Sequence, residues 1–339
     1  MELLKIIQED IPLTERPFKY IADRLNISES DVIRELKKLK EKKIVRQISP
    51  IYDTRKAGYE SSLVAFKVPP ERIEEVANFV SSCPGVSHNY EREDEFNLWF
   101  TLAVPPDAHL GLEELVKAMA ERNDVKEYVI LKTVKTFKIG VRFNFDSLFD
   151  REDNVPEPKS EIKEAIHLTD FEKALIRETQ EDLPLVEKPF RVISEKLCIS
   201  EKEVLEGLKN LKKKGVLRRF SSILFHRKVG FKANGMGVWR IDKEKIDEIG
   251  KFFAGYKAVS HCYERTTNEF WPYNLFTMIH GRRKEEVHEF CKRNAERLGI
   301  KNYKVLFSIR EFKKKRVKLF SQDFYYWEEK LLKSSFPSL

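Results

Sequence analysis

The chain has 339 residues, of which 41% are hydrophobic, and its 63 lysine and arginine residues outnumber 55 aspartate and glutamate residues. This length and apolar content predict about two domains with packed cores, and the chain has no apolar run of the roughly 18 residues that a transmembrane helix needs. The net charge of +8 favours an anionic partner, which can be nucleic acid, a phosphate or a polycarboxylate.

The N-terminal segment and the cysteines indicate the compartment. The first ten residues, MELLKIIQED, lack the basic start, apolar stretch and cleavage site of a signal peptide. The four cysteines are scattered without a C-x-x-C pair, which argues for free thiols and against a cysteine-based metal site. We therefore expect a cytoplasmic protein without a membrane segment.

The chain consists of two similar halves. QEDIPLTERPF at 8–18 matches QEDLPLVEKPF at 180–190 in eight of eleven positions, an offset of 172 residues. The offset continues through LNIS and LCIS, and after one inserted residue SHNYER at 87–92 aligns with SHCYER at 260–265. The charged, proline-bearing segment at 149–165 is typical of a linker. The sequence therefore predicts a tandem duplication.

Each half begins with a helix-turn-helix pattern. Pro17 suits the first turn of a helix, and Ser28 or Ser30 can cap a second helix. The apolar residues of each helix share one face, Phe18, Ile21 and Leu25 in the first and Val32, Leu36 and Leu39 in the second. A short strand is expected from Ile44 to Ile48. The C-half repeats this order.

The second part of each half alternates strands and helices. In the N-half, SSLVAFKV, GVSHNYERE, FNLWFTLAV and VKEYVILKTVKTF are predicted strands, with helices at PERIEEVANFVSSC and LEELVKAMAER. This order is β-α-β-β-α-β, a ferredoxin-like unit. The predicted fold class is therefore α+β, a tandem duplication in which each half is a winged helix-turn-helix plus a ferredoxin-like domain.

We expect the two halves to pair within the chain as a pseudo-dimer. The expected boundaries are 1–58 for the first helix-turn-helix, 59–148 for the first ferredoxin-like domain, 149–168 for the linker, 169–230 and 231–320 for the second copies, and 321–339 for a C-terminal docking tail. Two such chains can also associate as a homodimer.

The duplicated SHxYER segment is the strongest candidate for a site. On a strand, His261, Tyr263 and Arg265 share a face, whereas Ser260 and the alternate residues Cys262 and Glu264 are expected on the other. One interpretation is a polar face of a duplicated strand that is solvated or lies in the pseudo-dimer interface. The other is a pair of faces that hold an anionic ligand.

The order of elements resembles the Lrp/AsnC regulators. SHxYER, YNLFTMIHGR at 273–282 and RRFSSILFHRKVGF at 218–231 resemble, more narrowly, the siroheme decarboxylases, with the N-half similar to one subunit type and the C-half to the other. The resemblance implies a fused two-subunit enzyme that removes CO2 from two acetate side chains of siroheme. The product would be 12,18-didecarboxysiroheme, used for d-type heme or an alternative route to heme, with no organic cofactor.

That substrate suggests roles for the polar residues. Arginine binds carboxylates bidentately, so the expected substrate-binding residues include the arginines Arg218, Arg219, Arg227, Arg265 and Arg92, together with Tyr263, Asn274, His88 and Tyr90. Histidine can supply the proton that replaces CO2, and the candidates are His226, His261 and His280. His261 or His226 can alternatively ligate the iron of the substrate.

The halves are not equivalent at these positions. His226 aligns with Thr54, Arg219 with Gln47, and His280 with Ala103 or Val104. We therefore expect the principal catalytic pocket in the C-half, with His88, Tyr90 and Arg92 supplied from the N-half. Both decarboxylations could then use one pocket.

Two other functions remain open. In a DNA-binding regulator the second helix enters the major groove, and Arg34, Lys37 and Lys38 are available for phosphates. The C-half copy carries Glu201, Glu203 and Glu206 instead, which would repel phosphate and argue against DNA as a partner. A heme sensor without catalysis would bind a tetrapyrrole and not convert it.

Overall fold

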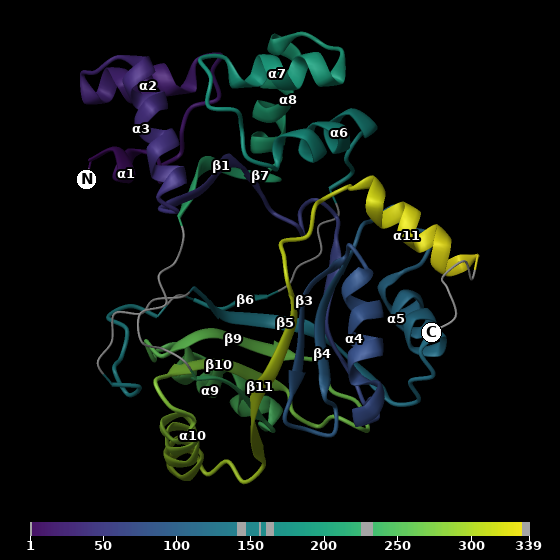
Figure 1. Ribbon diagram of the computed structural model, residues 1–339. Coiled ribbons are helices and arrows are strands. Elements are labelled where there is room, and N and C mark those ends of the chain that lie inside the picture. Colours follow the sequence, from purple (N-terminus) through teal and green to yellow (C-terminus); the bar gives the residue numbers. More distant parts are fainter. Residues whose placement is uncertain (1, 141–146, 156, 161–165, 225–232, 334–339) are drawn as a thin grey trace. The chain divides into compact units, whose positions relative to one another are not determined.

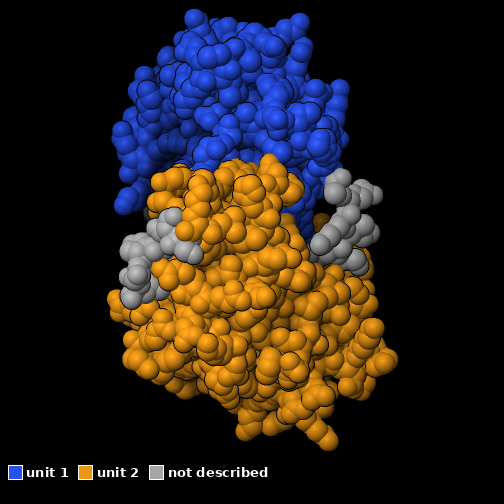
Figure 2. Space-filling view, turned by 90° about the vertical axis from the view of Figure 1, so that its right-hand side faces the viewer, with its two compact units in different colours: residues 1–59, 163–227, 318–322 blue, residues 60–162, 228–317, 323–339 orange. Residues whose placement is uncertain are grey.

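The computed structural model describes residues 2–140, 147–155, 157–160, 166–224 and 233–333. The chain divides into two compact units, coloured separately in Figure 2. Unit 1 comprises Met1–Tyr59, Lys163–Arg227 and Lys318–Gln322, and unit 2 comprises Glu60–Ile162, Lys228–Val317 and Asp323–Leu339. The two helix-turn-helix segments thus share one unit, and the two ferredoxin-like segments share the other. Within the described residues no helix is both long and apolar enough to span a membrane.

Unit 1 contains two copies of one helical motif. The first copy is α1 (Glu2–Ile6), α2 (Pro17–Leu25), α3 (Glu29–Glu41) and β1 (Val45–Tyr52), and the second is α6 (Asp170–Thr179), α7 (Pro189–Leu197), α8 (Glu201–Lys213) and β7 (Leu217–Leu224) (Figure 1). Ser28 caps α3 by accepting a hydrogen bond from the Asp31 amide, and Ser200 caps α8 in the same way. The strand expected after each helix-turn-helix is present, and the two strands pair antiparallel with each other.

The two copies in unit 1 also exchange their N-terminal arms. The Asp10 carboxylate accepts from the Phe220 amide at 3.0 Å and from Lys212 Nζ at 2.5 Å. The equivalent Asp182 carboxylate accepts from the Ile48 amide at 2.9 Å and pairs with a lysine of α3. Because each arm is held by the other copy, the helix-turn-helix pair is one pseudo-symmetric body.

Unit 2 contains two ferredoxin-like halves, as predicted. The N-half has β2 (Glu60–Phe66), a 3-10 turn (Pro70–Arg72), α4 (Ile73–Ser82), β3 (Val86–Arg92), β4 (Leu98–Val104), α5 (Leu112–Arg122) and β5 (Tyr128–Ile139), followed by the short β6 (Lys159–Ser160). The C-half has β8 (Ala233–Trp239), a 3-10 turn (Lys243–Lys245), α9 (Ile246–Ala254), β9 (Val259–Arg265), β10 (Leu275–Gly281), α10 (Lys284–Leu298) and β11 (Tyr303–Lys314), followed by α11 (Gln322–Leu332).

The last strand of each half crosses into the other half. The first part of β5 pairs with β2 of its own half, and its second part pairs with β9, where Thr133 lies opposite Arg265. Likewise β11 pairs first with β8 and then with β3, where Ser308 lies opposite Arg92. The hydrogen-bonded strand order is therefore cyclic, β2-β4-β3-β11-β8-β10-β9-β5 and back to β2. This is the intramolecular pseudo-dimer that the duplication predicts.

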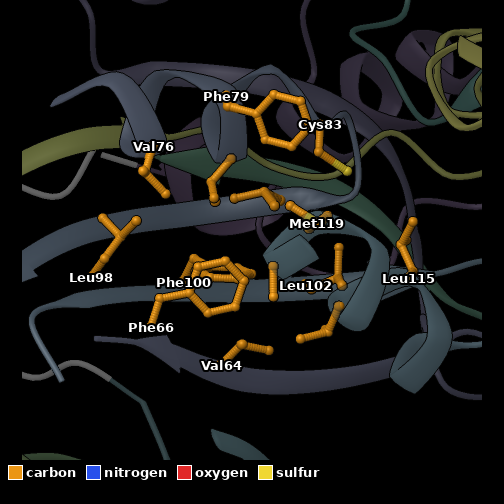
Figure 3. Close-up of a cluster of buried hydrophobic side chains, with 14 of the residues drawn as sticks. Val64, Phe66, Val76, Phe79, Cys83, Leu98, Phe100, Leu102, Leu115 and Met119 are labelled. Atoms are coloured by element: carbon orange, nitrogen blue, oxygen red, sulfur yellow. The ribbon is translucent and has the colours of Figure 1, made fainter. Parts of the chain in front are cut away.

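Within its described residues, unit 2 has three apolar clusters. The first lies between the N-half sheet and α4 and α5; Figure 3 shows Phe100 and Met119 within it, and α11 adds Trp327 to it. The second packs α9 and α10 on the C-half sheet. The third joins the opposite faces of the two sheets and includes Trp99 and Phe276. Helices cover one face of each sheet, so the remaining face of each sheet is where the halves meet.

Candidate active site

Both SHxYER strands carry a β-bulge at the serine. On β9, His261 lies opposite Met278 and Val259 lies opposite Ile279, so Ser260 is the extra residue. The bulge interrupts the alternation of side chains, and Ser260 Oγ lies 2.8 Å from His261 Nδ1. The prediction that Ser260 points away from the histidine was therefore wrong. Cys262 does point to the other face, where its Sγ contacts a main-chain carbonyl of α9.

A line of hydrogen bonds crosses three neighbouring strands of the C-half. Asn234 Oδ1 on β8 lies 2.7 Å from His280 Nδ1 on β10. His280 Nε2 lies 2.7 Å from Ser260 Oγ, which lies 2.8 Å from His261 Nδ1 on β9. The structure thus joins two of the predicted histidines through Ser260 and adds Asn234 at the far end of the line. The sequence had suggested no role for either of these two residues. We call Asn234, His280, Ser260 and His261 the relay.

Sequence signals for the two missed residues are weak. Asn234 becomes visible only from the register, which places it opposite His280. Ser260 recurs as Ser87 in the duplicated motif, and that repetition was the available clue. The bulge that turns both serines is a property of strand pairing, so the sequence pattern alone does not reveal it.

The N-half has the serine–histidine contact of the relay but not the contacts that follow it. Ser87 Oγ lies 2.9 Å from His88 Nδ1, and a bulge occurs at the same place. The position of His280 is taken by Ala103, which lies opposite Ser61 on β2. Because alanine has no polar side-chain atom, the N-half has no relay.

The two faces also differ beside the tyrosine. In the N-half, the Tyr90 hydroxyl donates to Glu311 Oε2 at 3.0 Å, and Glu311 lies opposite Tyr90 on β11. In the C-half, Thr136 of β5 lies opposite Tyr263. The N-half face therefore carries a carboxylate where the C-half face carries a neutral hydroxyl.

Burial keeps both motif histidines neutral. It lowers the pKa of His261 to about 4, and the neighbouring groups His88, Arg265 and Lys138 lower that pKa further. Burial and Lys314 also lower the pKa of His88, against the opposing effect of Glu311. Without a bound anion, both imidazoles are uncharged at neutral pH.

The two motif arginines reach across to the long strand of the other half. Arg265 Nη1 donates to the Leu131 carbonyl and to Thr133 Oγ1, both at 3.0 Å. Arg92 Nη1 donates to the Leu306 carbonyl at 3.1 Å, and burial lowers the pKa of Arg92 to about 10. Each guanidinium also lies over the tyrosine of its own motif. These contacts hold the pseudo-dimer together at the motif.

The structure describes contacts for two of the remaining predicted residues, Asn274 and Arg218. The Asn274 amide is used by the main chain of Ile241, to which it bonds twice at 2.8 Å. Arg218 and Arg219 lie on β7 in unit 1, where Arg218 Nε is 3.4 Å from Asp53. His226 and Arg227 lie outside the described residues. Among the residues that the structure describes, no cluster of His, Cys, Asp or Glu is suited to hold a metal ion.

Comparisons with known proteins agree with this architecture. A family model described as AsnC-like ligand binding domain matches residues 56–138 and 228–313. A second, described as Siroheme decarboxylase NirDL-like HTH domain, matches residues 1–46 and 172–218. The duplication seen in the sequence is thus present in both matches.

Similar proteins have been named and solved. The siroheme decarboxylase of Hydrogenobacter thermophilus is 47% identical over 331 residues, which cover 98% of each chain. A crystal structure of the siroheme decarboxylase NirDL in co-complex with an iron-uroporphyrin III analogue gives a TM-score of 0.83 at 43% identity, with 99% of each chain covered. The siroheme decarboxylase beta subunit of Methanosarcina barkeri is 43% identical over 43% of this chain and 95% of its own length. At 47% identity over nearly all of both chains, this chain belongs to the siroheme decarboxylase family.

Proposed function

We propose that this chain is a carboxy-lyase that removes CO2 from two acetate side chains of siroheme and yields 12,18-didecarboxysiroheme. The observation that carries the proposal is the relay, which ends at His261 on the same face as Tyr263 and Arg265. The similarity to a NirDL structure in complex with an iron-uroporphyrin III analogue supports a tetrapyrrole ligand. The iron belongs to the substrate, and no organic cofactor is required.

The reaction needs one proton for each CO2. The bond between the carboxylate carbon and the methylene carbon breaks, and its electron pair stays on the methylene attached to the macrocycle. That carbon then takes a proton and becomes a methyl group. Because bound substrate carboxylates favour a charged imidazole, they raise the pKa of His261 from its low value and let it carry the proton.

We assign the working site to the C-half. His261 is the proposed catalytic residue there, and His280 is proposed to act on it through Ser260. Tyr263 and Arg265 are proposed to orient the macrocycle. On the N-half face, the exposed carboxylate of Glu311 would repel a polycarboxylate, since like charges oppose each other. His88, Tyr90 and Arg92 are therefore proposed to bound the site rather than to turn over substrate. His226, Arg218, Arg219 and Arg227 remain candidates for substrate contact.

Contacts within unit 1 weigh against a DNA-binding role. A pocket of about 450 Å³ is lined by Ile33, Arg34 and Lys37 of α3 and by the segment Leu185–Glu187 of the other copy. Arg34 is paired with a neighbouring aspartate on α3. Lys38 is likewise paired with Glu35 of the same helix, so two of the three basic side chains that a recognition helix would offer to phosphates already have acidic partners.

The test is anaerobic incubation of the purified chain with siroheme, followed by mass analysis of the extracted tetrapyrrole. We expect the loss of two CO2 units, near-complete loss of turnover in His261→Ala, and a smaller effect of His88→Ala. Tight binding without a mass change would instead indicate a sensor. A dead His88→Ala with an active His261→Ala would move the working site to the N-half.

A further inference from the structure

We propose that Asn234, His280 and Ser260 are positioning residues that hold His261 as its Nδ1–H tautomer, so that Nε2 is the atom through which His261 exchanges a proton with the substrate. This inference rests on the proposed decarboxylase function. It adds two residues, Asn234 and Ser260, that the resemblance to known enzymes did not indicate.

The direction of the relay follows from the donors and acceptors along it. Asn234 Oδ1 can only accept, so His280 Nδ1 carries the hydrogen of their 2.7 Å bond. A neutral imidazole has one N–H, so His280 Nε2 accepts from the Ser260 hydroxyl at 2.7 Å. The alternative acceptor for that hydroxyl, the Met278 carbonyl, is farther away at 3.4 Å.

The last bond of the relay fixes His261. The Ser260 hydroxyl has a single hydrogen, which is committed to His280. Its oxygen must therefore accept from His261 Nδ1, at 2.8 Å. The proton of neutral His261 then sits on Nδ1, and the lone pair sits on Nε2. The hydrogen bond made by one ring nitrogen thus decides which state the other nitrogen has.

This tautomer suits proton delivery. When an imidazolium gives a proton to the methylene carbon, it returns to a neutral ring that keeps one N–H. The relay stabilises the neutral form that has lost its proton from Nε2, so it favours the state reached after transfer. Without Ser260, the neutral ring would have no partner for Nδ1–H in this line, and the other tautomer would compete.

The duplicated chain supplies a matched control. Ser87 contacts His88 Nδ1 at 2.9 Å just as Ser260 contacts His261. However, Ala103 and Ser61 stand where the relay has His280 and Asn234. Removing the Ser87 hydroxyl deletes an equivalent local bond without breaking a relay.

The experiment reads the tautomer and the turnover separately. Nitrogen-15 NMR of histidine-labelled protein without substrate reports which ring nitrogen is protonated, with the His261 signal identified by its loss in His261→Gln. We expect Nε2 to be unprotonated in the native chain and in Asn234→Asp, because a carboxylate can only accept. In Ser260→Ala we expect protonation to move towards Nε2 and kcat for siroheme to fall about tenfold, the effect of one hydrogen bond. In Ser87→Ala both readouts should stay close to those of the native chain.

The outcomes separate the two proposals. If the native chain decarboxylates siroheme but Ser260→Ala keeps the native tautomer or the native kcat, the relay proposal is wrong and the function stands. If the native chain converts no siroheme, the function is wrong, and the NMR comparison still decides whether the relay sets the tautomer. Should Ser260→Ala fail to fold, Asn234→Leu against Asn234→Asp makes the same comparison: equal tautomers in that pair would overturn the relay.

Discussion

Replacing Arg92 by methionine tests whether this buried cation stabilises the fold or serves the site. Arg92 is 6% exposed and lies between the sheets, with Nη1 bonded to the Leu306 carbonyl at 3.1 Å and its guanidinium 5.4 Å from the Tyr90 ring. Its Nε has no hydrogen-bond partner within the described part of the chain. The change removes the charge and keeps most of the side-chain volume.

The expected effect on stability is small because two contributions oppose each other. Burial lowers the pKa of Arg92 to about 10, which corresponds to about 3 kcal/mol against the charged form. The bond to the carbonyl contributes roughly 1.5–3 kcal/mol, and the ring contact contributes about 1 kcal/mol. The free energy of unfolding of Arg92→Met should therefore lie within about 2 kcal/mol of the native value.

The matched control is Arg265→Met on the other half. Arg265 Nη1 makes two bonds at 3.0 Å, and its guanidinium lies 4.9 Å from the Tyr263 ring. Arg265 is also less buried than Arg92, so it loses less solvation. We expect Arg265→Met to be the more destabilising change, by roughly 2–4 kcal/mol in urea unfolding.

The relative stabilities of Arg92→Met and Arg265→Met distinguish the two roles. A loss of more than about 3 kcal/mol in Arg92→Met, or a larger loss there than in Arg265→Met, would show that Arg92 is retained for stability. If Arg92→Met is nearly neutral and the Michaelis constant for siroheme rises, the buried charge serves the ligand. A stable variant with native kinetics would exclude both roles.

Three further predictions concern the scaffold. The pKa of His261 is about 4 in the folded chain and 6.5 in the unfolded chain. Its contribution to stability is therefore present above pH 6.5 and falls by up to about 3 kcal/mol towards pH 4, so the free energy of unfolding in urea should depend less on pH in His261→Gln than in the native chain. Lys313→Met removes two hydrogen bonds, at 2.7 and 2.8 Å, from Lys313 Nζ to carbonyls at the end of α4. It should lower the free energy of unfolding by roughly 1–3 kcal/mol in thermal unfolding, and a native melting temperature would show that Lys313 does not cap α4. Glu328 is fully buried and its carboxylate accepts hydrogen bonds from two main-chain amides ahead of α5. Glu328→Leu should therefore lower the free energy of unfolding by roughly 2–4 kcal/mol and expose α11 to limited proteolysis, and unchanged cleavage would contradict the docking of α11 through Glu328.

Local chemistry and repetition predicted most of the fold. The 172-residue offset indicated the duplication, and the alternation of apolar residues predicted the ferredoxin-like order. Of the two serines predicted as possible caps, Ser28 and Ser30, the structure has Ser28, and Ser200 caps the equivalent helix of the C-half. These features depend on neighbours in the sequence, which periodicity and turn chemistry report directly.

What the sequence did not predict depends on pairing between distant strands. The exchange of β5 and β11 between the halves depends on how these strands pair with β9 and β3. The register of such a pair cannot be predicted from the sequence of either strand alone. The same holds for the bulge that turns Ser260 towards His261 and for the position of Asn234 opposite His280. The sequence thus named the histidines and the tyrosine of the candidate site, whereas the connecting residues Ser260 and Asn234 were found only from the pairing of the strands.

The two halves have the same backbone fold but different polar side chains at the motif, and the way in which their strands pair explains how this is possible. Main-chain bonds between β3 and β11 and between β5 and β9 hold the halves together whichever side chains face inwards. Opposite the motif, Glu311 and Thr136 occupy equivalent positions, as do Ala103 and His280. Two identical subunits would have to carry the same residue at both positions. A chain with two different halves does not, so one face can gain a relay while the other gains a carboxylate, and the fusion keeps the two different faces paired one to one.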